Sequence, residues 1–520
     1  MGVRTVNFPL ISITTFLPIA GSLAVLAFSS RRETARAVAM TVAVLSLGMV
    51  LAIAAGFDPA RGDFQLEERH HWIPLLNVDY RVAVDGISLL FLLVTGLVVP
   101  MALMASWRVE EEAPLYFALI LMLQSGLFGT FTALNFFHWF LFWELSLVPA
   151  FFLVRLWGGP QRSAAATQFF VYTMAGSVAL LLAFLAIYWS TGQFDFTEIA
   201  GLSRSGGLTA ALDPLGWKGL TARQLQIVIF ALAFFGFAVK IPVVPFHTWL
   251  PPAYTEAGTG TTMLLTGLMS KMGVYGLLRI LLPIFPVEMQ WLQTPLLWAA
   301  VVTIVYSAGA ALAQRDMKRI LAYSSINHLG YCLLGVAAVL SATSMGSTPG
   351  AEKAAVLSGV LLQVFNHGIT AAALFWFAGV LEERSGGLRN LEDFGGLRKV
   401  APILCGFMGI ALFSSLGLPG LNGFPGEFLI FKGAFSLAPA AAVGAVLGLL
   451  LTAVFLLTLL QRVFYGPLHP GRTGFRDLGA RECLIFTPVV GLMFLLGVYP
   501  QVLLRYLNGT VIHVVNQIGF

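Results

Sequence analysis

The chain alternates long apolar runs with short polar loops over almost its whole length. A helix needs about 20 residues to cross a hydrocarbon core of roughly 30 Å, and the runs have this length. We count about fourteen, near residues 8–28, 36–56, 83–105, 114–134, 136–154, 165–191, 225–247, 257–282, 294–313, 318–341, 354–382, 401–438, 441–464 and 482–505. The pattern predicts an all-α polytopic membrane protein.

Two of these runs, the seventh and the twelfth, are interrupted. The seventh ends in KIPVVPFHTWLPPA, and the twelfth contains LGLPGLNGFPGEFLIFK. Each is the fourth run of a five-run group, which predicts two inverted five-helix repeats with broken helices, as in transporters. The expected division is three N-terminal helices in 1–113, a first repeat in 114–282, a second repeat in 283–464, and a last helix with the C-terminus in 465–520.

Composition agrees with a single membrane domain. The chain is 58% hydrophobic and 11% charged, whereas a soluble domain carries about 25% charged residues. Most of the 30 Lys and Arg residues lie in one alternate set of loops, which predicts that these loops face the cytoplasm, stroma or matrix and both termini the opposite side. Cys332, Cys405 and Cys483 are far apart and form no CxxC pair, which argues against an iron–sulfur cluster or structural zinc.

Three ionisable residues lie deep within predicted spans. They are Glu144, in NFFHWFLFWELSLVPAFF, Lys240, just before the first break, and Lys271, in TGLMSKMGVYGLLR. An ionisable group in a span is a functional hypothesis by default, because its burial is costly. A Glu144–Lys240 pair would hold a proton on Lys240 when close and release it when apart. The alternatives are a structural ion pair for Glu144 and a snorkelling side chain for Lys240.

A second group of titratable residues follows along the chain. His328, in YSSINHLGYC, and His367, in LQVFNHGIT, lie in consecutive runs, and Glu427 follows the second break. Histidine suits proton handover through water, although a lone buried histidine is usually a hydrogen-bonded core residue. His247, after the first break, is a candidate proton uptake group or a cap for free carbonyls. No metal-ligand spacing accompanies these residues, so we expect no metal site.

Other ionisable residues receive simpler interpretations. Arg279 is expected to be an interface anchor, Asp85 a helix N-cap, and Lys432 either a partner of Glu427 or a snorkelling side chain. His70 and His71 fall in a long polar loop and are assigned no role. We find no nucleotide-binding or nucleophile motif in the required context.

Together, KIPVVPFHTWLP, SKMGVYGLLR, LAYSSINHLGY, FNHGI and LPGLNGFPGEF resemble the antiporter-like membrane subunits of respiratory complex I, over about residues 80–505. The chain looks most like the M type, which corresponds to mitochondrial subunit 4 and its counterpart in chloroplasts and cyanobacteria. It stops soon after its last predicted span, without the long lateral helix of the L type. One departure is Tyr254, where the family commonly has histidine.

The resemblance implies a proton-translocating subunit of an NAD(P)H or ferredoxin:quinone oxidoreductase. Its implied proton relay is Glu144, Lys240, Lys271, His328, His367 and Glu427, with His247 in the uptake route. It implies no cofactor in this chain, while NADH or ferredoxin, flavin, iron–sulfur clusters and quinone belong to partner subunits. Its partners would be other membrane-arm subunits and lipid, with no nucleic acid, in a bacterial cytoplasmic or thylakoid membrane.

Three alternatives are weighed against this function. A subunit of a multi-subunit Na⁺(K⁺)/H⁺ antiporter would share the fold and the buried residues, and a membrane-bound hydrogenase subunit would share them too. A purely structural scaffold would tolerate Lys240→Ala and Glu144→Ala without loss of pumping.

Overall fold

The computed structural model describes residues 8–28, 31–213, 219–342, 344 and 349–518. Within them, 13 helical segments are long and apolar enough to cross a membrane. They are α1 (Leu10–Phe28), α2 (Arg32–Gly56), α3 (Gly86–Ala105), α4 (Ala113–Thr132), α5 (Phe136–Trp157), α6 (Arg162–Thr191), α9 (Ala222–Lys240), the composite segment Thr259–Ile284, α14 (Pro286–Leu312), α15 (Met317–Val339), α16 (Pro349–Arg384), α19 (Pro439–Phe464) and α20 (Ala480–Val498). The predicted all-α membrane architecture is confirmed.

The composite segment is not a regular α-helix. It consists of α11 (Thr259–Leu264), a π-helical turn η3 (Leu265–Met269), α12 (Lys271–Gly276), a second π-helical turn η4 (Leu277–Leu281) and α13 (Leu282–Ile284). The π-helical turns lie on either side of α12, which begins with Lys271. Such turns are rare and frequently occur at functional sites.

The seventh and twelfth predicted runs each contain a helix end. Helix α9 ends at Lys240, and α10 (Leu250–Glu256) begins after a nine-residue turn region, 241–249. The twelfth run consists of α17 (Pro402–Ser415) and α18 (Gly423–Leu437). The first interruption is satisfied internally, because Trp249 Nε1 donates to the Val239 carbonyl at 3.0 Å and Thr303 Oγ1 accepts from Val244 N at 3.1 Å. Free backbone groups at membrane depth need such partners.

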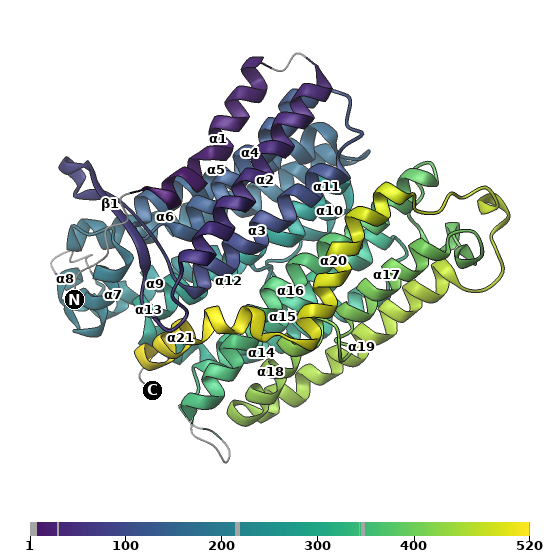
Figure 1. Cartoon of the computed structure of the whole chain (residues 1–520). Coiled ribbons are helices and arrows are strands. Elements are labelled where there is room, and N and C mark those ends of the chain that lie inside the picture. Colours follow the sequence, from purple (N-terminus) through teal and green to yellow (C-terminus); the bar gives the residue numbers. More distant parts are fainter. Residues whose placement is uncertain (1–7, 29–30, 214–218, 343, 345–348, 519–520) are drawn as a thin grey trace.

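The composite segment and α16 occupy the interior of the bundle. The most apolar stretch of each is fully buried, and α16 contacts α3, α11, α15 and α18. Figure 1 shows α16 and α15 between the N-terminal helices and α17–α19. The backbones of the two central helices approach closely, since a Cβ on Gly267 would lie 3.1 Å from the Gly368 carbonyl oxygen. Small residues allow this kind of close helix packing in membranes.

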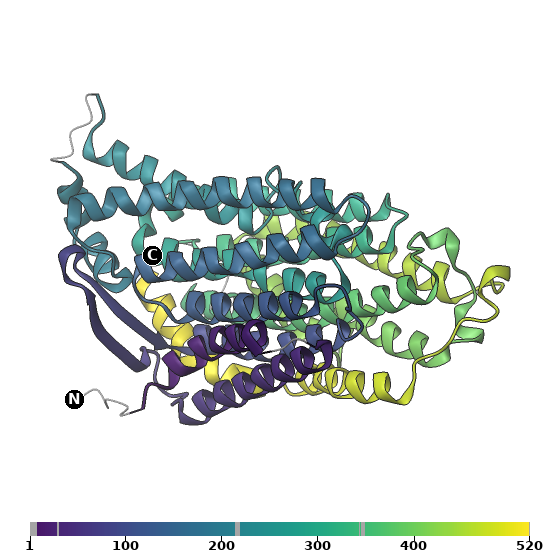
Figure 2. The same cartoon turned by 90° about the horizontal axis from the view of Figure 1, so that it is seen from above.

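The expected polar loop before the third span is instead a β-hairpin. Strands β1 (Gln65–Ile73) and β2 (Val78–Val84) pair antiparallel around the short helix η1 (Pro74–Leu76). Arg81 of β2 pairs with Glu67 of β1 at 2.8 Å and, across to the loop after α6, with Asp195 at 2.7 Å. The hairpin and the short helices α7 (Phe196–Arg204) and α8 (Gly207–Leu212) lie at one end of the bundle (Figure 2).

The last predicted run is also different. Pro500 separates α20 from α21 (Gln501–Ile518), so the run 482–505 is not one span. Helix α21 contacts α3 and α16, and its apolar residues Leu503, Leu507 and Val511 are buried. Thr510 Oγ1 accepts a hydrogen bond from Gly86 N at 2.9 Å. The chain therefore ends in a short amphipathic helix across the bundle. The remaining elements are the short helices η5 (Leu391–Asp393), η6 (Leu397–Lys399) and η7 (Pro470–Arg472).

Candidate functional site

Lys271 lies at the centre of the bundle with its ammonium group against a histidine. Its side chain is fully buried, and its Nζ lies 2.8 Å from His367 Nδ1. The Nζ also donates to the Thr266 carbonyl oxygen, which the preceding π-helical turn places beside it. The close contact between Gly267 and Gly368 explains why Lys271 and His367 meet, because each glycine lies near one of them on its helix.

His367 and His328 lie next to each other. Their ring centroids are 4.9 Å apart, and both side chains are buried. His328 Nε2 lies 3.0 Å from Ser415 Oγ, the last residue of α17. His328 therefore stands between the central helix α16 and the interrupted segment α17–α18.

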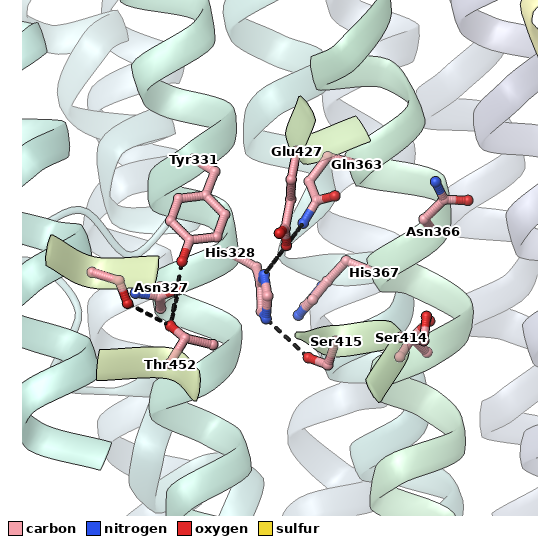
Figure 3. A network of polar contacts seen from close by, with 12 residues as sticks. Asn327, His328, Tyr331, Gln363, Asn366, His367, Ser414, Ser415, Glu427 and Thr452 are labelled. Carbon is pink, nitrogen blue, oxygen red and sulfur yellow. Dashed lines mark hydrogen bonds and ion pairs between the residues drawn. The ribbon is translucent and has the colours of Figure 1, made fainter. Parts of the chain in front are cut away.

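The other ring nitrogen of His328 faces Glu427, near the start of α18. Nδ1 lies 3.3 Å from Glu427 Oε1 and 3.2 Å from Gln363 Nε2. Gln363 Nε2 in turn donates to Glu427 Oε1 at 3.2 Å. Figure 3 shows His328 between Ser415 on one side and the Gln363–Glu427 pair on the other. Four of the predicted site residues thus form one line, Lys271–His367–His328–Glu427.

Two small cavities lie along this line. One, of about 10 Å³, is lined by His328, His367 and Glu427 among others. A second, also of about 10 Å³, is lined by His367, Ser325 and Ser415. A polar cavity of roughly 10–15 Å³ is the minimum that holds one water molecule. Each gap beside the histidines therefore has about the size of a single water.

Lys240 and Glu144 form a separate part of the site. Lys240 Nζ lies 4.9 Å from the ring centroid of Trp143, in cation–π geometry. Lys240 Nζ and Glu144 Oε1 are buried and have no hydrogen-bond partner among the described residues. Both groups lie in membrane spans, and neither of these two atoms bonds to the other among the described residues.

His247 lies in the interruption after α9. It is buried, its Nδ1 has no hydrogen-bond partner among the described residues, and its ring packs edge-on against Tyr306 at 5.1 Å. Tyr254, where the resemblance leads one to expect histidine, is also buried and donates its hydroxyl to the Leu265 carbonyl at 2.9 Å. Tyr254 therefore ties α10 to the π-helical turn that precedes Lys271.

Two further ionisable residues for which the sequence offered an interpretation, Asp85 and Lys432, have local partners. Asp85 caps α3 by accepting from Ser88 N at 2.9 Å, as predicted, and also pairs with Arg279 at 2.5 Å. Lys432 pairs with Glu352 at 3.2 Å rather than with Glu427. The described residues contain no group of three or more His, Cys, Asp or Glu side chains that could hold a metal ion.

Three features of the structure were not predicted from the sequence. The π-helical turns beside Lys271 have no recognisable pattern of residues. Gln363 belongs to the quoted LQVFNHGIT stretch, and its position one helical turn before His367 was an available signal. His138 lines a cavity of about 700 Å³ between α1, the β-hairpin and α5, whose lining includes none of the line's four residues, and its two ring nitrogens have no partners among the described residues.

Comparison with known proteins agrees with this architecture. Residues 133–452, more than half of the chain, match the family model described as NADH:quinone oxidoreductase/Mrp antiporter, TM. The chain belongs to this family. It is 37% identical to NADH-quinone oxidoreductase subunit M of Rhodobacter capsulatus, over 98% of this chain and 96% of the relative.

Two solved structures of family-like chains have the same fold. A chain of respiratory complex I from Thermus thermophilus with bound NADH is 28% identical, with a TM-score of 0.83, and the match covers 98% of this chain and 100% of that one. A chain of the Mrp complex from Dietzia sp. DQ12-45-1b is 23% identical, with a TM-score of 0.81 over 98% of this chain and 100% of that one. The second likeness extends to the fold alone.

Proposed function

We propose that this chain is a proton-translocating membrane-arm subunit of an NADH:quinone oxidoreductase in a bacterial cytoplasmic membrane. The observation that carries the proposal is the buried line Lys271–His367–His328–Glu427, whose neighbours lie 2.8 Å, 4.9 Å between ring centroids, and 3.3 Å apart. Each member can bind and release a proton, and water-sized cavities adjoin the histidines.

The chemistry of this line is proton transfer alone. The Lys271 ammonium can give a proton to His367 Nδ1, and a water in the cavity that both histidines line can pass one between them. His328 Nδ1 can then give a proton to Glu427. Charge interactions are much stronger in a low-dielectric interior than in water, so moving one proton shifts the balance at the next site. NADH oxidation, flavin, clusters and quinone reduction belong to partner subunits.

The Glu144–Lys240 pair supplies the switch in this proposal. When the two charges are close, the carboxylate stabilises the Lys240 ammonium, and when they separate, Lys240 gives up its proton toward Lys271. His247 takes up protons beside the interruption after α9. The two interrupted segments, α9–α10 and α17–α18, then have corresponding places in two inverted five-helix repeats.

A cation/proton antiporter subunit is the second candidate, because the family includes Mrp antiporters and one of them shares the fold. The near-complete alignment with an NADH-quinone oxidoreductase subunit at 37% identity favours the first candidate. Purification of the chain with its partners in mild detergent separates them. Co-purified cluster-bearing and quinone-binding subunits support the proposal, whereas partners without redox centres contradict it.

The proposed proton path is tested in the assembled complex. We expect Lys271→Met and Glu427→Gln to leave the complex assembled while protons pumped per electron decrease. Lys432→Met is the matched control, because Lys432 lies in a span but pairs with Glu352 outside the line. Pumping that is unchanged in both test variants would support a purely structural scaffold instead.

A further inference from the structure

Gln363 bridges the two last groups of the line. Its Nε2 lies 3.2 Å from His328 Nδ1 and 3.2 Å from Glu427 Oε1 (Figure 3). The residue is 2% exposed, and its other amide atom, Oε1, is buried without a hydrogen-bond partner among the described residues. A buried amide oxygen without a partner is unusual in a folded protein and calls for an explanation.

The amide determines which nitrogen of His328 carries the proton. A side-chain NH₂ group can only donate, so the imidazole nitrogen that faces it must accept. In this orientation of the amide, one NH₂ group bridges two acceptors, His328 Nδ1 and Glu427 Oε1, so that Nδ1 is unprotonated and Nε2 carries the hydrogen toward Ser415 Oγ at 3.0 Å. The partner of one ring nitrogen sets the tautomer in this way.

This arrangement blocks the last transfer. A proton can reach Glu427 from His328 only through Nδ1, the nitrogen that lies 3.3 Å from Oε1. A protonated Nδ1 would place its N–H against the N–H of Gln363, so two donors would face each other. The amide must turn by about half a rotation before Nδ1 can hold a proton.

The turned amide is stable only when His328 and Glu427 together hold one additional proton. Its Oε1 would then face His328 Nδ1 and Glu427, and an ionised carboxylate offers only acceptors. When the proton is on His328 Nδ1 or on Glu427, Gln363 Oε1 accepts a hydrogen bond from that group instead. The amide therefore has one favoured orientation when Glu427 is ionised and the opposite one when the pair is loaded.

Gly426 provides the space for Gln363. A Cβ at position 426 would lie 2.9 Å from Gln363 Oε1 and 2.9 Å from its backbone nitrogen. The adjoining cavity of about 10 Å³ is lined by Gln363 as well as by His328 and Glu427. Gly426 therefore leaves room beside the amide group of Gln363, on the side where the unpartnered oxygen lies.

We propose that Gln363 is a positioning residue whose amide rotation gates proton transfer from His328 to Glu427. The inference rests on the proposed function and adds a control element to it. A water in the cavity that His367 and His328 both line delivers the additional proton to Nδ1 of His328. In the gated step this Nδ1–H bond breaks, an O–H bond forms on Glu427, and the electron pair of the N–H bond stays on the imidazole. When Glu427 then releases its proton, the amide turns back toward Nδ1, which is again unprotonated.

The test uses the intact complex in membrane vesicles. Gln363→Met keeps the length of the side chain but removes both the donor and the acceptor, whereas Gln363→Glu keeps a head group that can donate or accept once protonated. The matched control is Gln226→Met, because Gln226 is also buried and donates to a carboxylate, Glu288, at 3.1 Å but lies outside the line. Assembly, NADH:quinone activity and protons pumped per electron are measured for each, together with Glu427→Gln.

We expect Gln363→Met to assemble and to reduce quinone, with a ratio of protons per electron that falls to the value of Glu427→Gln. Gln363→Glu should recover part of that loss, and Gln226→Met should pump normally. A normal ratio in Gln363→Met beside a lowered ratio in Glu427→Gln overturns the gate and leaves the proposed function intact. Normal ratios in both overturn the proposed function.

A spectroscopic measurement tests the same gate if a variant assembles too poorly for the pumping assay. The infrared difference spectrum of the complex with and without NADH turnover, with glutamine isotopically labelled, should contain a side-chain amide band that Gln363→Met lacks. The same band should be missing from Glu427→Gln, because without the carboxylate the amide has no reason to turn. A band that persists in Glu427→Gln contradicts the gate.

Discussion

The buried ion pair between Asp85 and Arg279 gives a quantitative test of the packing. The two charged groups are 2.5 Å apart, and their side chains are 4% and 9% exposed. Arg279 lies in the second π-helical turn, and Asp85 caps α3, so the pair joins the composite segment to its neighbour. The perturbations are Arg279→Met and Asp85→Asn, singly and together, where Asn keeps a side-chain oxygen for the cap.

The expected magnitude follows from burial. Removing one partner of a buried ion pair leaves an uncompensated charge and costs about 3–5 kcal/mol, whereas replacing both is often nearly neutral. Each single variant should therefore lower the folded-to-unfolded ratio by roughly 150- to 4,000-fold, because about 1.4 kcal/mol is a factor of ten. The double variant should be more stable than either single one.

The assay is the thermal midpoint of the purified complex in detergent for the four proteins. We expect the order wild type, double variant, then the two single variants. If the stability losses of the two single variants simply add in the double variant, the reasoning is refuted, because the two charges would then be solvated independently.

Three further predictions follow from local contacts. Lys432→Met should cost less than about 1 kcal/mol and leave pumping unchanged, since Lys432 is 50% exposed; the same vesicle assay checks this. Gly273→Val should impair assembly in native gels, because its Cβ would lie 2.5 Å from Ile241 Cγ1, whereas Gly309→Val, with nothing within 4 Å, should not. The Arg69 hydrogen bond lowers the pKa of Asp79, so its contribution to the hairpin is complete above the ordinary pKa of 3.8 and is lost as pH falls through the lower folded value. Amide hydrogen exchange in 65–84 should therefore accelerate below about pH 4 in the wild type but not in Asp79→Asn.

Much of the helical fold could be predicted from the sequence, because lipid requires long apolar runs with internally satisfied backbones. The hairpin at 65–84 was not predicted, since its strands interleave charged and apolar residues outside the membrane and carry no simple alternation. Helix α21 was missed because its first apolar residues continue the preceding run, although Pro500 marks the boundary.

The candidate site could be predicted only as a set of separate residues. Lys271, His328, His367 and Glu427 come from four different helical segments, and no spacing along the chain requires them to meet. Their contact depends on tertiary features such as the close approach of Gly267 to Gly368. The partner of Lys432 could not be predicted either, because only the structure shows that it pairs with Glu352.

His367 offers the most direct test of the central claim, because it lies between Lys271 and His328. The measurement is the number of protons pumped per electron by the assembled His367→Phe complex in sealed vesicles, with quinone reduction followed in the same sample. We predict a complex that assembles and reduces quinone but pumps fewer protons per electron. An unchanged ratio would contradict proton passage through this line.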